Sequence, residues 1–395
     1  MIDFEEAVGL VRQVARPLGT ERVPLEQAHG RVLAAPVMAQ VGSPSADVST
    51  MDGYAVRDGD VATLPARLQV IGESFPSRGC DAPLGEAECV RIFTGGPVPL
   101  GANRVVIQEQ VRREGDVAAI DGPFGEARHI RRRGSDFEVG DLLLEPGRVV
   151  DARALVAAAG ADLAEVEVWR RPRVFILVTG DELAEPGTAG AVPGSIPESI
   201  SLGVAALARD WGGEIVGRRR LRDELEPMVE AAAEALETPD LVVVTGGASV
   251  GERDFAKAMF EPAGLALIFS KVAIKPGKPI WLGRARDRLV MGLPGNPASA
   301  LVTARLLLAP LLAGLTGRDP AAALGWRDVP LAGEVEACGD RETFLRARRD
   351  NGMARPLSNQ DSGAQRTLAG ADLLIRRRAH APAASAGDMA EILDF

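Results

Sequence analysis

The sequence predicts a multidomain protein of the α/β plus β class, in which a central three-layer α/β/α domain with a parallel sheet is combined with β-rich regions. Three observations lead to this prediction. A chain of 395 residues exceeds what one hydrophobic core usually organises. Between residues 173 and 317, continuous apolar strands alternate with helical stretches, the pattern of strands buried on both faces of a parallel sheet. Residues 32–150 and 326–395 instead carry short apolar runs broken by Gly, Pro and Asp, which is typical of β-rich regions.

The first expected element is a helix near the N-terminus. Asp3 is placed to cap it and Glu6 to complete a capping box, while apolar residues recur at helical spacing at Phe4, Val8, Val11 and Val14. After the strand-like runs RLQVIGES, CVRIFTG and RVVIQEQV, the stretch DARALVAAAGADLAEVEV predicts a helix that ends at Gly160, followed by a return strand. Near the C-terminus, DLLIRRRAH and MAEILDF predict strands of a small β domain.

Within residues 173–317 the predicted strands are VFILVTG, LVVVTGG and RLVMGLPG, and the predicted helices include ISLGVAALARDWGG, ELEPMVEAAAEALE and ASALVTARLLLAPLLAGL. Gly180, Gly246, Gly292 and Gly295 all follow such strands. Ligands of open α/β sheets bind at the carboxyl ends of the strands. We therefore expect the ligand site at this edge of the sheet.

Composition and charge exclude several classes of protein. The net charge of −10 argues against a nucleic-acid-binding surface, because neutralising phosphates requires clustered Lys and Arg. The acidic N-terminus lacks the pattern of a secretory signal, and no stretch reaches the ~18 apolar residues that span a bilayer, so we expect a cytoplasmic protein with no membrane partner. The spacing of the cysteines and histidines excludes a disulfide framework and a histidine-rich zinc site. We expect all three cysteines to be small buried residues: Cys80, Cys89 and Cys338.

The turn LVVVTGGASVGERD at residues 241–254 predicts an anion site, because glycines let backbone amides approach a phosphate and the next helix end adds positive potential. A structural turn without a ligand is the alternative. The carboxylates of Glu182 and Asp254 follow equivalent strands, so they predict either bound Mg²⁺ or recognition of donor groups on a base, with helix capping as the alternative. Asp181 is expected to stabilise its turn.

Two further segments carry residue types suited to anions. KVAIKPGKP places Lys271, Lys275 and Lys278 around a rigid turn, which suits an oxyanion or phosphate unless these lysines only face solvent. GLPGNPAS, with Pro294, Gly295 and Asn296, predicts a ligand-facing turn or a stiff connection before a helix. In the N-terminal region, Asp52 in STMDGYAVR, Thr94 in RIFTGGPVP and Asp136 in RRRGSDF each fit an ordinary β-turn when taken alone.

Taken together, these segments resemble the molybdopterin molybdenumtransferase family, which inserts molybdate into adenylylated molybdopterin in the final step of molybdenum cofactor synthesis. The resemblance covers nearly the whole chain and rests on MDGYAVR, RIFTGGPVP, HIRRRGSD, TGDEL, TGGASVGERD, KPGKP and LPGNPAS in the family's order. It implies a homodimer with a linker domain at residues 1–40 and 146–171, an inserted β domain at 41–145, a molybdopterin-binding α/β domain at 172–325 and a C-terminal β domain at 326–395. The active site would lie between subunits.

The resemblance also implies roles for individual residues. Pterin and nucleotide phosphates would be bound by the glycine turn and by LPGN, and molybdate or pyrophosphate by the lysines with residues of the last domain. Acidic partners would sit in the α/β domain, with Mg²⁺ at two of them, Asp223 and Asp254. The implied catalytic residues are Asp52, Thr94 and Asp136, entering from the partner subunit, with Glu182, Asp223, Asp254, Lys271 and Lys275; the substrate-binding residues are Gly246, Gly247, Ser249, Gly251, Lys278, Pro294, Gly295, Asn296, Arg346 and Ser362.

The implied reaction is exchange at the dithiolene, with Mg²⁺-assisted release of AMP and no covalent nucleophile on the protein. One departure stands in SIPESISLG, where Glu198 and Ser199 replace the family's polar pair and Ile200 replaces an expected asparagine. Two rival functions remain: a molybdopterin adenylyltransferase, which usually lacks N-terminal domains such as those here, and a non-catalytic scaffold paralogue. Other molybdenum cofactor biosynthesis proteins are further expected partners.

Overall fold

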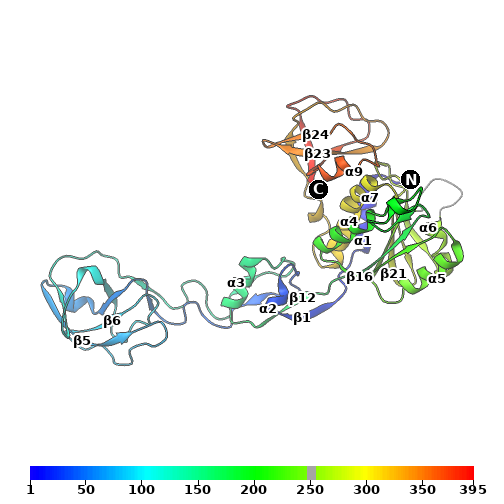
Figure 1. Cartoon of the computed structure of the whole chain (residues 1–395). Helices are drawn as coiled ribbons and strands as arrows, with labels where there is room; N and C mark the ends of the chain where they lie inside the picture. The colour runs from blue at the N-terminus through cyan, green and yellow to red at the C-terminus, as the bar shows by residue number, and fades with distance from the viewer. Residues whose placement is uncertain (247–254) are drawn as a thin grey trace.

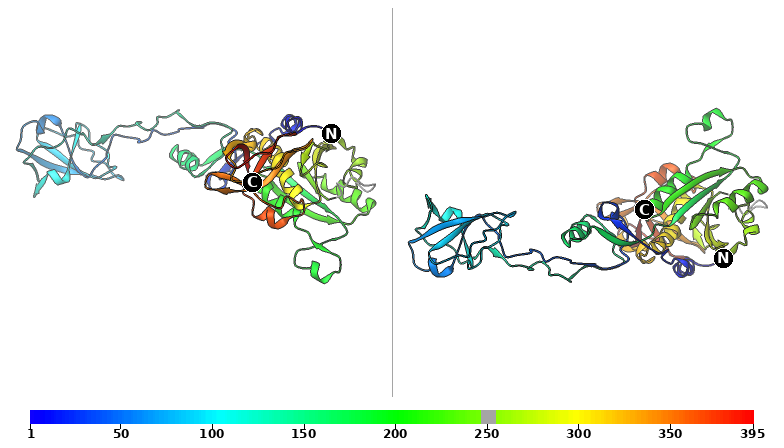
Figure 2. Two further views of the ribbon diagram at one scale, coloured as in Figure 1. Left: turned by 90° about the horizontal axis from the view of Figure 1, so that it is seen from above. Right: turned by 90° about the horizontal axis from the view of Figure 1, so that it is seen from below.

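The computed structural model describes residues 1–246 and 255–395 and shows an elongated molecule (Figure 1). One small β-rich unit, which contains β5 (Ala66–Ser74) and β6 (Glu88–Ile92), stands at one end. The α/β unit and the C-terminal β unit lie together at the other end, next to both termini. Two chain segments running side by side make the connection to the far unit, which stands apart in all views (Figure 2).

The central sheet of the α/β unit has six strands in the order β16-β13-β17-β21-β20-β18. The first four run parallel, but β20 pairs antiparallel with both β21 and β18. The prediction of a parallel sheet is therefore wrong at this edge. Only residues 286–287 separate β20 from β21, and so short a connection permits only a hairpin. The strands are β13 (Arg173–Thr179), β16 (Glu214–Leu221), β17 (Leu241–Thr245), β18 (Ala266–Ser270), β20 (Trp281–Ala285) and β21 (Arg288–Leu293).

Helices cover both faces of this sheet, as the three-layer prediction requires. Alternate residues of each strand point to opposite faces, so Val243 joins the core cluster on one face and Val242 joins the other. The first face is covered by α1 (Phe4–Val14), α4 (Ile200–Asp210), α7 (Pro297–Thr303), the π-helical turn η5 (Ala304–Leu308) and α8 (Ala309–Leu315). The second is covered by α5 (Leu225–Ala235) and α6 (Phe255–Ala258).

The N-terminal helix confirms its predicted cap, since the Asp3 carboxylate accepts a 2.8 Å hydrogen bond from the Glu6 backbone N–H. The α7–α8 segment, Pro297–Leu315, is by length and composition alone sufficient to cross a membrane, with a mean hydropathy of 1.8. The prediction that no such stretch exists is wrong on that criterion. Because 94% of the segment's window is buried inside the structure, it is a core helix of the α/β unit.

The middle unit pairs β1 (Thr20–Pro24) with β12 (Glu165–Trp169) and packs α2 (Leu25–Ala28) and α3 (Ala152–Gly160) into one core. The predicted helix ending at Gly160 and its return strand are thus confirmed. Two pairs of short strands lead outwards, namely β2 (Val37–Met38) with β11 (Leu142–Leu144) and β3 (Val48–Ser49) with β10 (Ile130–Arg131). The far sheet has the order β7-β4-β6-β5-β9-β8 and includes β4 (Gly53–Val56), β7 (Arg104–Ile107), β8 (Arg112–Glu114) and β9 (Val117–Ile120).

The C-terminal sheet has the order β19-β23-β25-β26-β22, with β24 also paired to β23. Its first strand, β19 (Ile274–Lys275), comes from the α/β part of the chain and runs parallel to β23. Phe344 of this sheet packs against Phe4 and Trp326, with ring centroids 5.1 Å and 6.1 Å away. The two units therefore share one core. The remaining strands are β22 (Arg327–Pro330), β23 (Glu342–Asp350), β24 (Met353–Pro356), β25 (Leu373–Arg377) and β26 (Met389–Asp394).

The cysteine prediction holds only for Cys89, which is buried; Cys80 and Cys338 are half-buried and all three are free thiols. Cys80 and Cys338 lie on the loops around their sheets rather than on core strands, which is why composition alone misassigned them. Burial raises the pKa of the Cys89 thiol to about 12, so it is protonated and unreactive near neutral pH.

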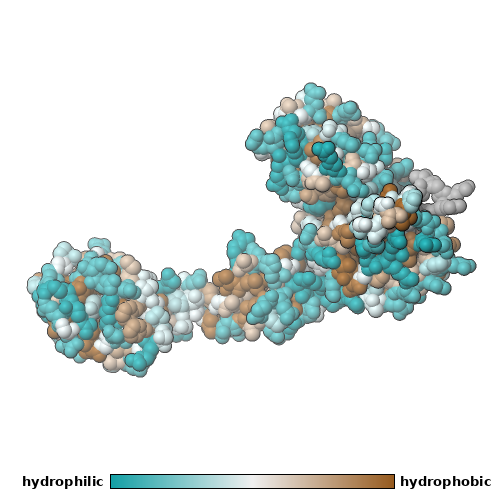
Figure 3. Space-filling view, viewed as in Figure 1, coloured by the Kyte–Doolittle hydropathy of each residue, from teal (hydrophilic) through white to brown (hydrophobic). Residues whose placement is uncertain are grey.

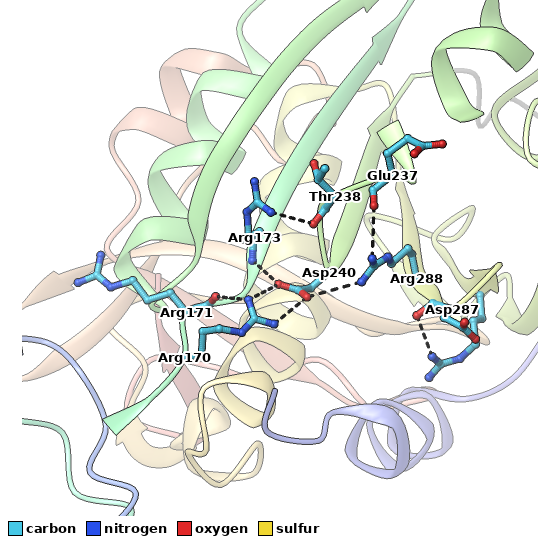
Figure 4. Close-up of polar contacts among 9 residues, drawn as sticks. Arg170, Arg171, Arg173, Glu237, Thr238, Asp240, Asp287 and Arg288 are labelled. Carbon is cyan, nitrogen blue, oxygen red and sulfur yellow. Dashed lines mark hydrogen bonds and ion pairs between the residues drawn. The ribbon is translucent and has the colours of Figure 1, made fainter. Parts of the chain in front are cut away.

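Asp240 joins the middle unit to the amino ends of the central strands (Figure 4). Its carboxylate, 8% exposed, accepts two 3.0 Å hydrogen bonds from Arg170, which follows β12, and one of 2.8 Å from the backbone N–H of Arg173, which begins β13. Arg288, the first residue of β21, lies 3.9 Å away. One carboxylate thus holds the inter-unit connection at the edge of the sheet opposite its carboxyl ends.

Replacing Asp240 with alanine is expected to lower the free energy of unfolding by about 2–4 kcal/mol, because three donors would lose a buried acceptor. Chemical denaturation followed by circular dichroism measures the effect. Glu234→Ala is the control: it removes the exposed pair with Arg219 and should change stability by less than about 1 kcal/mol. Equal effects of the two variants would contradict the role assigned to Asp240.

Candidate active site

A cavity of about 770 Å³ opens at the carboxyl ends of β13, β17 and β21, the edge at which the sequence predicts the ligand site. The turns after these strands line it, together with the N-terminus of α4 and residues of the C-terminal unit. Predicted site residues brought together here are Glu182, Asp223, Gly246, Pro294, Gly295 and Asn296.

Two glycine turns form one side of the cavity. A Cβ on Gly246 would lie 2.3 Å from the backbone oxygen of Thr179, and its φ of +89° also favours glycine. A Cβ on Gly295 would lie 3.3 Å from Cα of Gly246, so the turns after β17 and β21 are in backbone contact. Gly246 and Gly295, from two predicted glycine turns, therefore form one continuous surface.

Carboxylates give the cavity its charge. Glu182 and Asp223 both line it, and the Glu182 carboxylate folds back over Gly180, where a Cβ would lie 3.0 Å from both of its oxygens. Asp181 accepts a 3.1 Å hydrogen bond from the Asp223 backbone N–H, so its carboxylate connects the turn after β13 to the segment after β16 rather than bonding within its own turn. Among the described residues that line this cavity there is no lysine or arginine, so it favours ligand groups that donate hydrogen bonds.

Two lining residues not predicted from sequence are Thr179 and Thr245, the last residues of β13 and β17. Both hydroxyls are buried and lack a hydrogen-bond partner within the part of the chain that the structure describes. Their position at the strand ends was the available signal, but threonine is common in strands and drew no attention. Other such lining residues are Ile196, Pro197, Pro279, Ser299, Gly363 and Gln365.

The departure from the family pattern lies at the start of α4. Glu198 is only 3% exposed, accepts hydrogen bonds from the backbone and hydroxyl of Ser201 at 2.9 Å and 2.6 Å, and pairs with Arg218 at 3.2 Å. These bonds occupy its carboxylate at the helix end. Ile200, 9% exposed, lines the cavity, so this part of the wall is apolar.

We call the segment KVAIKPGKP, residues 271–279, the lysine turn. It lies beside the cavity, because its last residue, Pro279, lines the cavity wall. A Cβ on Gly277 would lie 2.1 Å from Cγ2 of Thr303 in α7, so only glycine lets the turn pack this closely. All three lysines are exposed, and Lys275 borders a second cavity of about 510 Å³ beside the C-terminal unit. Lys271 and Lys278 border neither cavity, although Lys278 directly precedes Pro279.

The C-terminal unit reaches the cavity through the segment after β24. The Asn296 amide donates a 3.0 Å hydrogen bond to the Ser362 hydroxyl, and the Ala298 backbone N–H donates to the Ser362 carbonyl, also at 3.0 Å. Arg346 is fully buried behind this segment and donates to the Asp361 carbonyl at 2.9 Å. Its Nη2 has no partner in the described chain, and burial lowers the pKa of its guanidinium.

Three predicted residues lie outside this group. The backbone N–H and the hydroxyl of Thr94 both donate to one Asp52 oxygen, at 2.7 Å and 2.8 Å, and these bonds lower the pKa of the Asp52 carboxyl. Both residues adjoin the far sheet, at the opposite end of the chain from the cavity (Figure 1). Asp136 lies on the connection to that sheet, with its backbone N–H bonded to Ser43. Gly247, Ser249, Gly251 and Asp254 lie outside the described residues.

Sequence comparison gives three matches in order along the chain. Residues 2–161 match the MoeA N-terminal region (domain I and II), residues 175–314 a probable molybdopterin binding domain, and residues 328–395 the MoeA C-terminal region (domain IV). The molybdopterin molybdenumtransferase of Haemophilus influenzae is 37% identical over 78% of this chain and 76% of its own length. The chain belongs to the MoeA family of molybdopterin molybdenumtransferases.

Other relatives agree with the MoeA assignment. Molybdopterin molybdenumtransferase 2 of Mycobacterium tuberculosis is 35% identical over 78% of both chains. The crystal structure of the molybdopterin biosynthesis MoeA protein of Pyrococcus horikoshii has a TM-score of 0.85 and 29% identity, covering 99% of this chain and 98% of its own. The chain is thus an enzyme of this family, with the MoeA fold.

Gly277→Ala is expected to lower the free energy of unfolding by about 1–3 kcal/mol, because φ at this position is +107° and the new methyl group meets Thr303. Thermal and chemical denaturation measure the loss. Adding Thr303→Ser should restore part of it, since serine keeps the hydroxyl bonds to Ser299 and Ala300 but lacks Cγ2. If the double variant recovers no stability, contact of the new methyl group with Thr303 is not the reason why glycine is required at position 277.

Proposed function

We propose that this MoeA enzyme binds adenylylated molybdopterin in the 770 Å³ cavity, exchanges molybdate into its dithiolene and releases AMP with the help of Mg²⁺. The observation that carries the proposal is the separation of charge. Carboxylates line the cavity, whereas Lys278 directly precedes Pro279 in its wall and the Arg346 guanidinium lies behind the segment that carries Ser362. A ligand with a donor-rich ring and an anionic end fits this division.

Each group has a role set by its chemistry. Glu182 and the Asn296 carbonyl oxygen would accept hydrogen bonds from the amino and ring N–H groups of the pterin. Lys278 and Ser362, with the unpartnered Nη2 of Arg346 behind them, would bind molybdate or the pyrophosphate. Fixed cations there stabilise charge that develops on phosphate and molybdate oxygens, and no protein nucleophile is needed. Lys271 and Lys275 would act as further cations in this group.

Mg²⁺ would be held by Asp223 together with Asp254, of which Asp223 lies in the described part of the chain. Mg²⁺ in enzymes commonly takes one or two carboxylates and keeps several waters, so it does not require a larger cluster of acidic residues. Among the described residues there is no group of three His, Cys, Asp or Glu that could hold a metal. When bound, Mg²⁺ would neutralise charge on the pyrophosphate.

A homodimer would bring Asp52, Thr94 and Asp136 to the cavity of the other subunit. Within one chain the far sheet and the cavity lie at opposite ends, so the same chain does not bring them together (Figure 2). Apolar side chains gather around α3 in the middle unit, which fits a surface covered by a second copy (Figure 3). Val156 of α3 is 74% exposed, and exposed apolar residues of neighbouring segments include Leu142 of β11 at 52% and Val149 at 36%.

The matches to the N-terminal and C-terminal MoeA regions favour the transferase over the two alternatives, a molybdopterin adenylyltransferase and a scaffold paralogue. We further propose a cytoplasmic location and transient contact with other proteins of molybdenum cofactor biosynthesis.

Purified protein mixed with adenylylated molybdopterin, Mg²⁺ and molybdate is expected to release AMP. Glu182→Gln should lower kcat/KM by at least about tenfold, the effect of losing a charged acceptor for a ligand donor. Glu224→Gln is the matched control: this exposed residue does not line the cavity and should leave the rate unchanged. No AMP release by the wild-type protein would refute the proposed reaction.

Coexpression of Asp52→Asn and Lys278→Ala chains tests the shared site. Each variant alone should be inactive, but a mixed dimer would contain one site with neither substitution. Random pairing then restores roughly a quarter of the wild-type AMP release. Activity of the mixture no higher than that of the separate variants would contradict a site built from two subunits.

A further inference from the structure

One edge of β23 has a gap that a side chain fills. Along this edge, β19 pairs with Glu342 and Thr343, and β24 pairs with residues from Ala347 to Asp350. Neither strand pairs with the three residues between them, residues 344–346. A buried backbone N–H or carbonyl in such a gap needs a partner from elsewhere.

The Arg346 carbonyl accepts a 3.0 Å hydrogen bond from the backbone N–H of Leu357, which follows β24, but the Arg346 N–H is bonded by the side chain of Gln360. Its Oε1 accepts from the Arg346 backbone N–H at 2.9 Å and from Nε of the same residue at 3.3 Å. Its Nε2 donates to the Arg346 carbonyl at 2.9 Å and to the Leu357 carbonyl at 2.7 Å. The carboxamide thus uses two donors and two acceptor positions, its full hydrogen-bonding capacity, and takes the place of a neighbouring strand at the Arg346 N–H.

The position of Gln360 affects the active site through the residues that follow it, 361–363. With Gln360 fixed at the sheet edge, the next residue, Asp361, accepts from the Arg346 guanidinium, and Ser362 contacts Asn296 and the first turn of α7. Gly363 then lines the cavity. Three bonds to Ser362 and Asp361 therefore depend on where Gln360 holds the chain.

Gln360 also adjoins the lysine turn. It borders the 510 Å³ cavity together with Lys275 and Thr343, which are paired across β19 and β23. The edge of one strand thus sets the positions of both the lysine turn and the Ser362 segment. We propose that Gln360 is a positioning residue for the molybdate-binding end of the site, acting by holding Ser362 and the Arg346 guanidinium in place.

This inference rests on the proposed function, and two measurements on the full-length protein separate their failures. Gln360→Met keeps the length of the side chain and removes all four hydrogen bonds. The KM for molybdate in the AMP-release assay should rise at least about tenfold, with a smaller change in kcat, because a displaced binding group weakens binding before chemistry. Hydrogen exchange should quicken at the amides of residues 357–363 and Ala298, while β25 and β26 remain protected.

Gln360→Glu is the conservative variant, since one carboxylate oxygen can still accept from Arg346; its molybdate KM should lie between those of wild type and Gln360→Met. Gln13→Met, on the exposed face of α1, is the matched control and should behave as wild type.

A wild-type molybdate KM and unchanged local exchange in Gln360→Met would overturn the inference. Faster exchange throughout β25 and β26 would also overturn it, because the residue would then support the whole sheet. Absence of AMP release by the wild-type protein would instead refute the proposed function, and the exchange measurement would still decide the role of Gln360.

Discussion

The pairing of β19 with β23 is the constraint on which the candidate site depends. Strand β19, Ile274–Lys275, belongs to the α/β part of the chain by sequence. It pairs with β23 in the sheet of the C-terminal unit rather than with the central sheet. The shared core of Phe4, Trp326 and Phe344 fixes the two sheets relative to each other. Arg376 adds to this connection by stacking over the Phe4 and Trp326 rings and pairing with Glu5 and Glu342. This junction therefore fixes the positions of the lysine turn and of the segment that carries Ser362.

Charge is distributed unevenly across that junction. The strand ends of the α/β unit contribute Glu182 and Asp223, whereas Lys278 precedes Pro279 in the cavity wall and the C-terminal unit contributes the buried Arg346 guanidinium behind Ser362. A carboxylate-lined cavity alone would repel the phosphates of an adenylylated ligand, and the cations alone would not distinguish a pterin from other anions. In the proposed complex each unit would supply part of the recognition, and the sheet pairing and common core would hold these parts in a fixed relative position.

Sequence reasoning located the central features because they depend on local chemistry. Apolar strands followed by glycines predicted both the parallel strands and the edge that holds the cavity, and Gly246 occupies the backbone conformation expected of it. It did not predict the antiparallel edge formed by β20, because hairpin and crossover connections differ only in the few residues between strands. It also missed Gln360, whose importance comes from a gap between two distant strands. Arg346 was assigned to the site through the family resemblance, but its complete burial was not visible in sequence.

The central claim is that one cavity, completed by the C-terminal unit, binds the pterin nucleotide. A crystal structure of the protein with adenylylated molybdopterin tests it most directly. We expect the pterin between Glu182 and Asn296, with the anionic end of the ligand directed toward Lys278 and Ser362. Ligand bound at another surface, with this cavity unoccupied in the same crystal, would contradict it.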